Sequence, residues 1–310
     1  MEMAAKTDID SGLREHSMAL EFCVLASGSA GNATVLRAGG QCALIDAGIG
    51  PRAADKRMIG TGITPADIRA ICLTHLDTDH FSPAWLAGIC RQEIKVYCAE
   101  GHAKALRRLA RQEKLLKPLQ PLLKLFGTEP FDVLPDVRCR TLRLPHDKQG
   151  SQGFLFEYRG SRLGFATDLG RAPVELIELF AGVDLLAMES NYDSDMQLSS
   201  RRSDRVKKRI MGGRGHLSNV EAFEAVQDIL DLTEARHGAA KWPRHLVLLH
   251  RSRQCNSPSI VLKLFNQDPR IAPILTLAHQ NQRTEWLSSA PRQALPGEQL
   301  GLFDMAAAIG

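Results

Sequence analysis

Short apolar runs, bounded by Gly, Pro or Asp, are interspersed with longer segments in which apolar residues recur every three or four positions. The short runs predict β-strands at residues 21–26, 42–46, 68–74, 94–98, 153–158, 163–167, 185–189 and 245–250. The longer spacing predicts helices over 82–92, 101–117, 173–180, 218–235 and 257–266. Because strands and helices do not alternate strictly, we expect layered sheets with helices outside them, an α/β architecture.

Both ends of the chain lack this pattern. Residues 1–17 predict a polar N-terminal extension, and residues 286–310, rich in Pro, Gly, Ser and Ala, predict a flexible tail, which leaves the folded domain at 18–285. The N-terminus has no apolar core like that of a signal peptide, and no run of about 18 apolar residues follows. We therefore expect a cytoplasmic protein with no membrane association.

Composition narrows the class of protein only slightly. The 310 residues, 44% of them hydrophobic, suffice for one large domain or two small ones. A net charge of +4 is too weak for a histone-like binder and names no partner. The seven cysteines are scattered and form no CxxC pair, which argues against a disulfide framework and a zinc ribbon and favours a reducing compartment.

The stretch THLDTDH places four potential metal ligands directly after the predicted strand 68–74: His75, Asp77, Asp79 and His80. A loop at the carboxyl end of a strand can turn such side chains toward one cavity. A lone Asp at this place would more simply cap the next helix. Two histidines alternating with two acids favour metal binding.

Four further candidates stand at other strand ends: Asp46 in LIDAG, His146 in LPHDKQG, Asp168 in FATDLG and His250 in LVLLHRS. Each has an ordinary explanation by itself, since Asp before Gly is a common turn and a strand-end His is often only a polar terminus. Their shared position predicts that they form one site with the THLDTDH loop.

The order of these residues resembles the metallo-β-lactamase superfamily, whose pattern is an Asp after the second strand, a HxHxDH loop, and then His, Asp and His at later strand ends. The resemblance covers residues 21–256. The segments ASGSAGN (26–32), MESNYD (188–193), GHLSN (215–219) and HRSRQCNSP (250–258) are similar to the branch that contains the WalJ-type nuclease and the phosphoribosyl cyclic phosphodiesterases. This resemblance implies a four-layer αββα sandwich of two mixed sheets.

The resemblance also implies two divalent metal ions, zinc or manganese. The ligands that it implies are His75, Asp77 and His146 for one ion, Asp79, His80 and His250 for the other, and Asp168 as the bridge. Asp46 would stand behind the ligands and hold the HLDTDH loop.

Asp77 departs from the superfamily pattern, because most members have His at this position. A similar HxDxDH form occurs in the metallohydrolase domain of the ComEC DNA-uptake protein and in a phosphorylcholine esterase, so the change is compatible with activity. A carboxylate in place of an imidazole favours manganese or another hard ion over zinc. Loss of this first metal, which would leave a mononuclear centre, is the alternative.

Two ions about 3.5 Å apart can activate water and neutralise charge on a phosphoryl oxygen. The predicted catalytic residues are Asp79, at the metal pair, and His216 in GHLSN, which resembles the histidine that protonates the leaving oxygen in related phosphodiesterases. Without the resemblance, His216 is equally well a solvent-facing loop residue. In ASGSAGN, Ser29 and Asn32 are candidates to contact a phosphate, although Gly-Ser turns are usually only turns.

Two basic segments, 104–117 and 201–209, are either solvated faces or tracks for a nucleic-acid backbone. In the tail, QLGLF at 299–303 resembles the QLxLF peptide by which bacterial DNA-processing enzymes dock on the polymerase sliding clamp. The contacts that this resemblance implies are Gln299, Leu300, Leu302 and Phe303. The alternative is a chain end that packs on its own domain.

Together these features predict a metal-dependent phosphodiesterase, a DNA-directed nuclease of replication or repair that the sliding clamp recruits. One alternative is a hydrolase of small cyclic phosphodiesters or thioesters, which needs neither a cationic track nor a clamp peptide. Another is a catalytically weak adaptor on the clamp. The superfamily's metal centre cleaves phosphoesters, thioesters and lactams, so fold alone does not identify the substrate.

Overall fold

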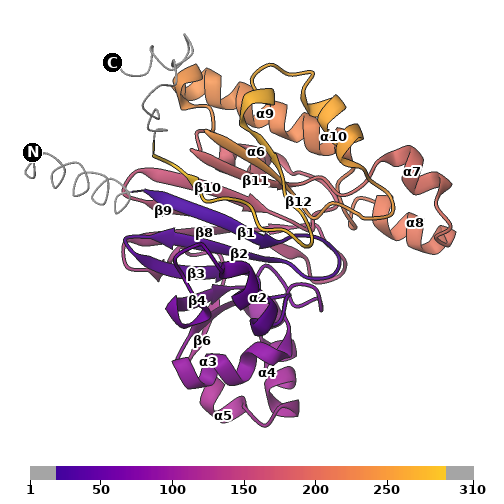
Figure 1. The fold of residues 1–310 in the computed structure, drawn as a ribbon. Helices are drawn as coiled ribbons and strands as arrows, with labels where there is room; N and C mark the ends of the chain where they lie inside the picture. The colour runs from indigo at the N-terminus through magenta and orange to yellow at the C-terminus, as the bar shows by residue number, and fades with distance from the viewer. Residues whose placement is uncertain (1–18, 291–310) are drawn as a thin grey trace, which may run out of the picture.

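The structure, a computed structural model, describes residues 19–290, so the predicted extension at 1–17 and the QLGLF motif at 299–303 lie outside the described residues. Two mixed seven-stranded sheets lie face to face, and helices cover the outer side of each (Figure 1). The αββα sandwich expected from the sequence is confirmed.

The first sheet has the strand order β14-β1-β2-β3-β4-β5-β6. Its strands are β1 (Leu20–Ala26), β2 (Ala33–Ala38), β3 (Gln41–Ile45), β4 (Ile68–Cys72), β5 (Lys95–Ala99), β6 (Leu123–Phe126) and β14 (Leu287–Ser288). β3 to β6 run parallel, so the loops after β3, β4 and β5 leave the same edge. The helices on this side are α2 (Pro51–Met58), α3 (Leu86–Gln92), α4 (Ala103–Gln112) and α5 (Leu116–Leu119), with short turns η1 (Pro65–Asp67), η2 (Pro83–Trp85) and η3 (Glu100–His102).

The second sheet has the order β13-β12-β11-β10-β9-β8-β7. Its strands are β7 (Phe131–Leu134), β8 (Val137–Leu144), β9 (Ser151–Tyr158), β10 (Ser161–Ala166), β11 (Leu185–Glu189), β12 (His245–Leu249) and β13 (Leu275–Leu277). The helices α6 (Val174–Phe180), α9 (Asn219–His237) and α10 (Pro258–Phe265) cover its outer face, whereas α7 (Ser194–Ser199) and α8 (Asp204–Met211) project at one end (Figure 1). Two short turns, η4 (Ala239–Lys241) and η5 (Ala272–Ile274), complete the elements.

Alternating side chains of β1 divide between two cores, because successive residues of a strand point to opposite faces. Phe22 and Val24 belong to the core between the two sheets, and Cys23 and Leu25 belong to the core under α2 and α3. All seven residues of β1 are buried. This placement explains why β1 is a continuous apolar run rather than an alternating one.

The eight strands predicted from the sequence are all present, with ends shifted by one or two residues. The prediction of one helix over 101–117 is wrong, because the backbone turns left-handed at Lys114 (φ 59°) and separates α4 from α5. β2, β8 and α8 were not predicted. β8 and α8 carry too many polar or charged residues to stand out as apolar runs.

The start of the segment expected to be a tail is part of the fold. β14 pairs antiparallel with β1 through Leu287 and Ser288, and the Trp286 indole donates a hydrogen bond to the Thr61 carbonyl. The described domain therefore extends past residue 285. Within residues 19–290, no helix is both long and apolar enough to cross a bilayer.

Candidate metal centre

Side chains that the sequence placed at separate strand ends meet at one edge of the sandwich. Asp46 follows β3, Asp168 follows β10, His250 follows β12, and the 73–80 loop follows β4. Asp46, Asp168 and His250 have left-handed backbone angles (φ 59°, 52° and 51°). Such conformations cost energy in non-glycine residues and gather at functional sites, where the fold compensates for the strain.

Four imidazoles are fixed with the same ring atom toward the centre. Nδ1–H of His80 donates to Asp46 Oδ2 (2.7 Å), and Nδ1–H of His146 donates to the Gly215 carbonyl (2.8 Å). Nδ1 of His75 is 3.0 Å from the Thr74 hydroxyl oxygen, and Nδ1 of His250 is 3.0 Å from a Glu189 carboxylate oxygen. In each ring Nε2 is the nitrogen that remains for a metal ion, the arrangement that metal-binding histidines adopt. At His80, the Asn32 amide nitrogen (3.0 Å) and Asp168 Oδ2 (2.6 Å) lie beside this atom.

The first group of donors consists of His75, Asp77 and His146. Asp77 Oδ2 lies 3.8 Å from His75 Nε2 and 4.0 Å from His146 Nε2. His75 Nε2 is buried and has no hydrogen-bond partner. A buried polar atom without a partner is costly unless something binds it, so this group fits a metal ion that contacts His75 Nε2.

The second group consists of Asp79, His80 and His250. Asp79 Oδ2 lies 3.7 Å from His80 Nε2 and 3.3 Å from His250 Nε2. Ligand atoms about 2.1 Å from a tetrahedral metal lie about 3.4 Å from one another, so both groups have separations of the right size. They could hold two ions.

Asp168 lies between the two groups. Its Oδ2 is 2.6 Å from His80 Nε2. One ligand atom from each of Asp168, His75 and His80 lies within 4.8 Å of the other two. Burial disfavours its charge, but the neighbouring His250 and His80 rings hold the pKa of its carboxyl well below the usual range. Conversely, although burial opposes it, Asp168 and Asp46 raise the pKa of His80 to about 10. A metal ion on Nε2 competes with that proton.

Asp46 holds the 73–80 loop through hydrogen bonds to His80 and Thr74. Besides His80, its carboxylate accepts hydrogen bonds from the Thr74 backbone N–H (2.8 Å) and from the Thr74 hydroxyl (2.8 Å). Asp46 and Thr74 are both buried. One carboxylate therefore orients a ring of the second group and, through Thr74, a ring of the first.

The two predicted phosphate contacts differ in position. Ser29 lines a cavity of about 400 Å³, which residues of both donor groups also line. These two donor groups are called the metal groups below. Asn32 is buried, and its amide oxygen accepts from the Gly28 backbone N–H (2.8 Å). Its amide nitrogen lies 3.1 Å from the Gly28 carbonyl oxygen, 3.2 Å from the Asp79 carbonyl oxygen and 3.0 Å from His80 Nε2. Asn32 therefore links two loops beside a donor of the second group, and its contact with a phosphate stays a prediction.

Gly48 is a residue that the sequence argument missed. A Cβ at this position would overlap the Asp79 carbonyl oxygen and lie 2.8 Å from the Asn32 backbone nitrogen. Both neighbours are themselves bonded, because Asn32 N–H donates to Asp79 O at 2.7 Å. The turn at residues 46–48, Asp-Ala-Gly (the DAG turn), thus needs glycine at position 48, because three loops approach one another closely there. This requirement is visible only in three dimensions.

Glu189, at the end of β11, is the second missed residue. It is fully buried, and its Oε1 lies 2.8 Å from His216 Nδ1 and 3.0 Å from His250 Nδ1. The available signal was a carboxylate at the end of a buried parallel strand in MESN. Glu189 ties the predicted acid to a ligand of the second group.

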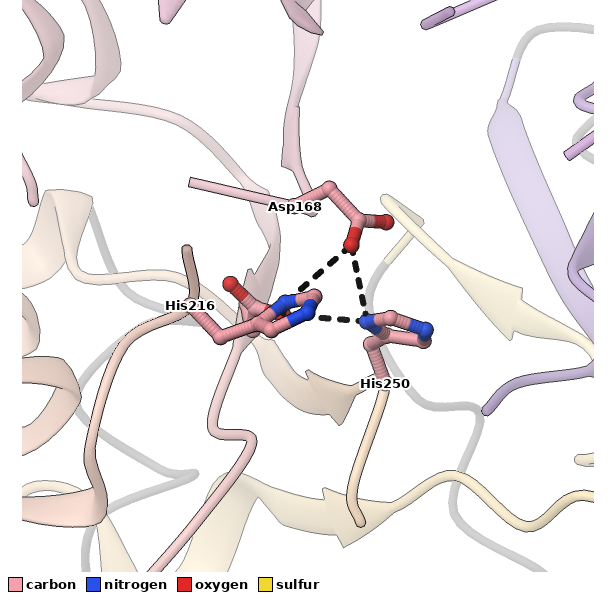
Figure 2. A group of neighbouring side chains, drawn as sticks. Asp168, His216 and His250 are labelled. Atoms are coloured by element: carbon pink, nitrogen blue, oxygen red, sulfur yellow. Dashed lines mark hydrogen bonds and ion pairs between the residues drawn. The ribbon is translucent and has the colours of Figure 1, made fainter. Parts of the chain in front are cut away.

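His216 lies beside the second donor group, close to Asp168, Glu189 and His250. Figure 2 shows the Asp168 carboxylate facing the rings of both His216 and His250, with 3.1 Å from Oδ1 to each Nδ1. Burial opposes it, but Glu189 and Asp168 raise the pKa of His216 to about 9. The ring lines the same cavity as Asp79.

Comparison with known proteins agrees with this geometry. A family model described as "Beta-lactamase superfamily domain" matches residues 43–250. The exodeoxyribonuclease YycJ of Bacillus anthracis is 26% identical over 222 residues, 71% of this chain and 81% of the relative. The exodeoxyribonuclease WalJ of Streptococcus pneumoniae is 24% identical over 208 residues, 66% of this chain and 75% of the relative.

Among solved structures, the metallo-β-lactamase fold protein YhfI from Bacillus subtilis has a TM-score of 0.62 at 14% identity, over 86% of this chain and 99% of that chain. That likeness concerns the fold, and the family match spans most of the chain and ends at His250, the last predicted ligand. The chain therefore belongs to the β-lactamase superfamily and is a hydrolase of the metallo-β-lactamase fold.

Proposed function

We propose that the protein is a metal-dependent phosphodiesterase that cleaves DNA. The observation that carries this proposal is the pair of donor groups joined by Asp168, with His216 on the wall of the same cavity. The names of the two relatives, both exodeoxyribonucleases, support DNA as the substrate. Replication or repair is the process in which such an enzyme acts.

In this proposal His75, Asp77 and His146 hold one divalent ion, Asp79, His80 and His250 hold the second, and Asp168 contacts both. When bound, such ions neutralise charge on the phosphoryl group and lower the pKa of the attacking water. Asp77 favours a hard ion such as manganese at the first group, whereas the imidazole-rich second group also suits zinc.

The chain's own residues supply orientation and a proton. Glu189 and Asp168 accept from His216 Nδ1, so the ring's other nitrogen, Nε2, is the one that can donate a proton to the leaving oxygen. Asp79 belongs to the second group and lines the cavity, where it helps to position the reacting phosphate. Ser29 lies in the same cavity as a hydrogen-bond donor for a phosphate oxygen.

The basic segment 201–209 supports a nucleic-acid substrate. Arg202 and Arg209 line the cavity over the metal groups, and Arg209 is an exposed residue of α8. Phosphate contacts from such residues make binding strongly dependent on salt. A small uncharged ester would have no use for them.

The direct test is metal analysis of the purified protein together with cleavage of end-labelled single- and double-stranded DNA, with added manganese or zinc. We expect metal-dependent cleavage that Asp168→Ala removes, whereas Asp228→Ala, an exposed change on α9, leaves it intact. A fully metallated protein that cleaves small cyclic phosphodiesters but no DNA would establish the small-molecule alternative. Absence of bound metal under all conditions would favour the adaptor.

We also propose that residues 299–303 recruit the enzyme to the sliding clamp, on the basis of the QLGLF sequence. Clamp affinity, measured by calorimetry, should be lost when these five residues are placed in shuffled order, while turnover on short DNA stays the same. Equal clamp affinity of the shuffled variant would remove this part of the proposal. Clamp binding implies the cytoplasm, where the seven cysteines, all without disulfides, are stable as thiols.

A further inference from the structure

A second cavity, of about 580 Å³, adjoins the one over the metal groups. The two cavities share Asp77, His146 and Arg209 as a common wall. The rest of the second cavity is formed by His75, the 147–150 loop, the end of α8, the 212–214 turn and η3. A molecule that reaches the first metal group from this side therefore passes through a separate space with its own lining.

The lining of the second cavity is cationic. Lys148, Lys208 and Arg214 line it, each on a different segment of the chain. Arg209 is held by Asp147, which accepts from Arg209 Nε at 3.0 Å and from a second guanidinium nitrogen. Because this pair neutralises itself, Lys148, Lys208 and Arg214 are offset only by the Asp77 carboxylate on the shared wall. The cavity therefore suits an anion with more than one negative charge.

A buried histidine fixes the shape of this cavity. His102 is 4% exposed, and its Nε2–H donates to the Gly150 carbonyl at 3.1 Å. This bond ties η3 to the 147–150 loop, which carries Lys148.

We infer that this cavity binds a phosphomonoester at the end of the strand whose neighbouring phosphodiester lies at the metal groups. A phosphomonoester carries about −1.5 to −2 charges at pH 7, and nearby cations favour its dianion. An internal diester has one charge. The cationic lining therefore fits the terminal group better than an internal one, and the enzyme prefers phosphorylated ends.

This inference rests on the proposed nuclease function, and the test keeps the two apart. Matched oligonucleotides ending in 5′-phosphate, 5′-hydroxyl, 3′-phosphate or 3′-hydroxyl are compared by kcat/KM. We expect a phosphate at one of the two ends to raise kcat/KM about tenfold or more, as for hydrogen bonds to a charged group. Cleavage at equal rates for all four would overturn the inference and leave the nuclease standing, whereas no cleavage of any would refute the nuclease.

Charge-matched variants assign the preference to this cavity. In Lys148→Met/Lys208→Met the ratio of kcat/KM for phosphorylated and hydroxyl ends should fall to about one. Lys56→Met/Lys263→Met removes the same charge from exposed residues of α2 and α10 and should keep the ratio.

A last comparison distinguishes strand ends from free nucleotides, which carry the same phosphomonoester. Thymidine monophosphates and thymidine are tested as competitors of the wild type and of Lys148→Met/Lys208→Met. Competition by a monophosphate, reduced in the lysine variant and accompanied by the end preference, supports the inference. Competition without any end preference would overturn it in favour of a site for free nucleotides.

Discussion

Gly48 and Gly50, in the loop after β3, have different surroundings, and this difference predicts different effects of the same substitution. A Cβ added at Gly48 overlaps the Asp79 carbonyl oxygen, whereas a Cβ at Gly50 meets nothing within 4 Å. Gly50 has an ordinary extended backbone (φ −64°) before α2. Gly48→Ala and Gly50→Ala therefore make the same chemical change in buried and open surroundings.

The magnitude follows from what must move. To reach ordinary van der Waals contact at about 3.5 Å, the Asp79 carbonyl must retreat by more than about 1 Å, which breaks its hydrogen bonds from the Asn32 backbone (2.7 Å) and side chain (3.2 Å). Overpacking costs about 1–3 kcal/mol, and each lost hydrogen bond adds about 1 kcal/mol. We expect Gly48→Ala to lower the free energy of unfolding by about 3–5 kcal/mol.

The same displacement moves a candidate ligand of the second group, since the Asp79 side chain shifts with its carbonyl. A misplacement of about 1 Å costs on the order of 100-fold in turnover. Urea unfolding, metal content and kcat/KM are measured for both variants. Gly50→Ala should stay within about 1 kcal/mol of the wild type, because only a modest capping preference changes. A Gly48→Ala protein with wild-type stability and metal content would show that the loops move apart at little cost in free energy, which would refute the prediction.

Three further changes test other parts of the structure. Glu189→Gln should slow cleavage of DNA about 10- to 100-fold, through the lost charge beside His216, but aryl phosphodiesters much less; equal slowing on both, at unchanged metal content, would contradict this role. Asp77→His should raise zinc affinity relative to manganese about tenfold in competition binding; an unchanged ratio would speak against its place as a ligand. Arg270 holds the pKa of the buried Asp268 carboxyl at about 2, against an ordinary 3.8. Because this pKa is depressed, Asp268→Asn should cost about 2 kcal/mol above pH 4. The difference in unfolding free energy from the wild type should vanish between pH 4 and pH 2, and a pH-independent difference would exclude the ion pair as its cause.

The sequence predicted the elements of the fold where burial produces a simple pattern of apolar residues. Strands such as β11, covered on both faces, are continuous apolar runs and were placed to the residue. β8 was missed because four of its eight residues are arginine or threonine. The turn at Lys114 also escaped prediction, because the helical spacing of the cations continues across it.

The candidate site divides in the same way. The sequence by itself indicated the candidate donor residues, because imidazoles and carboxylates at strand ends are conspicuous beside apolar runs and are the groups that a metal centre needs. Only the tertiary structure showed that the Asn32 side chain links two loops, and that a Cβ at position 48 would overlap the Asp79 carbonyl oxygen. It also showed that Glu189 contacts His216 and that His102 lines a cationic cavity. Each of these facts depends on a contact between segments far apart in the chain, and no local pattern of residues encodes such a contact.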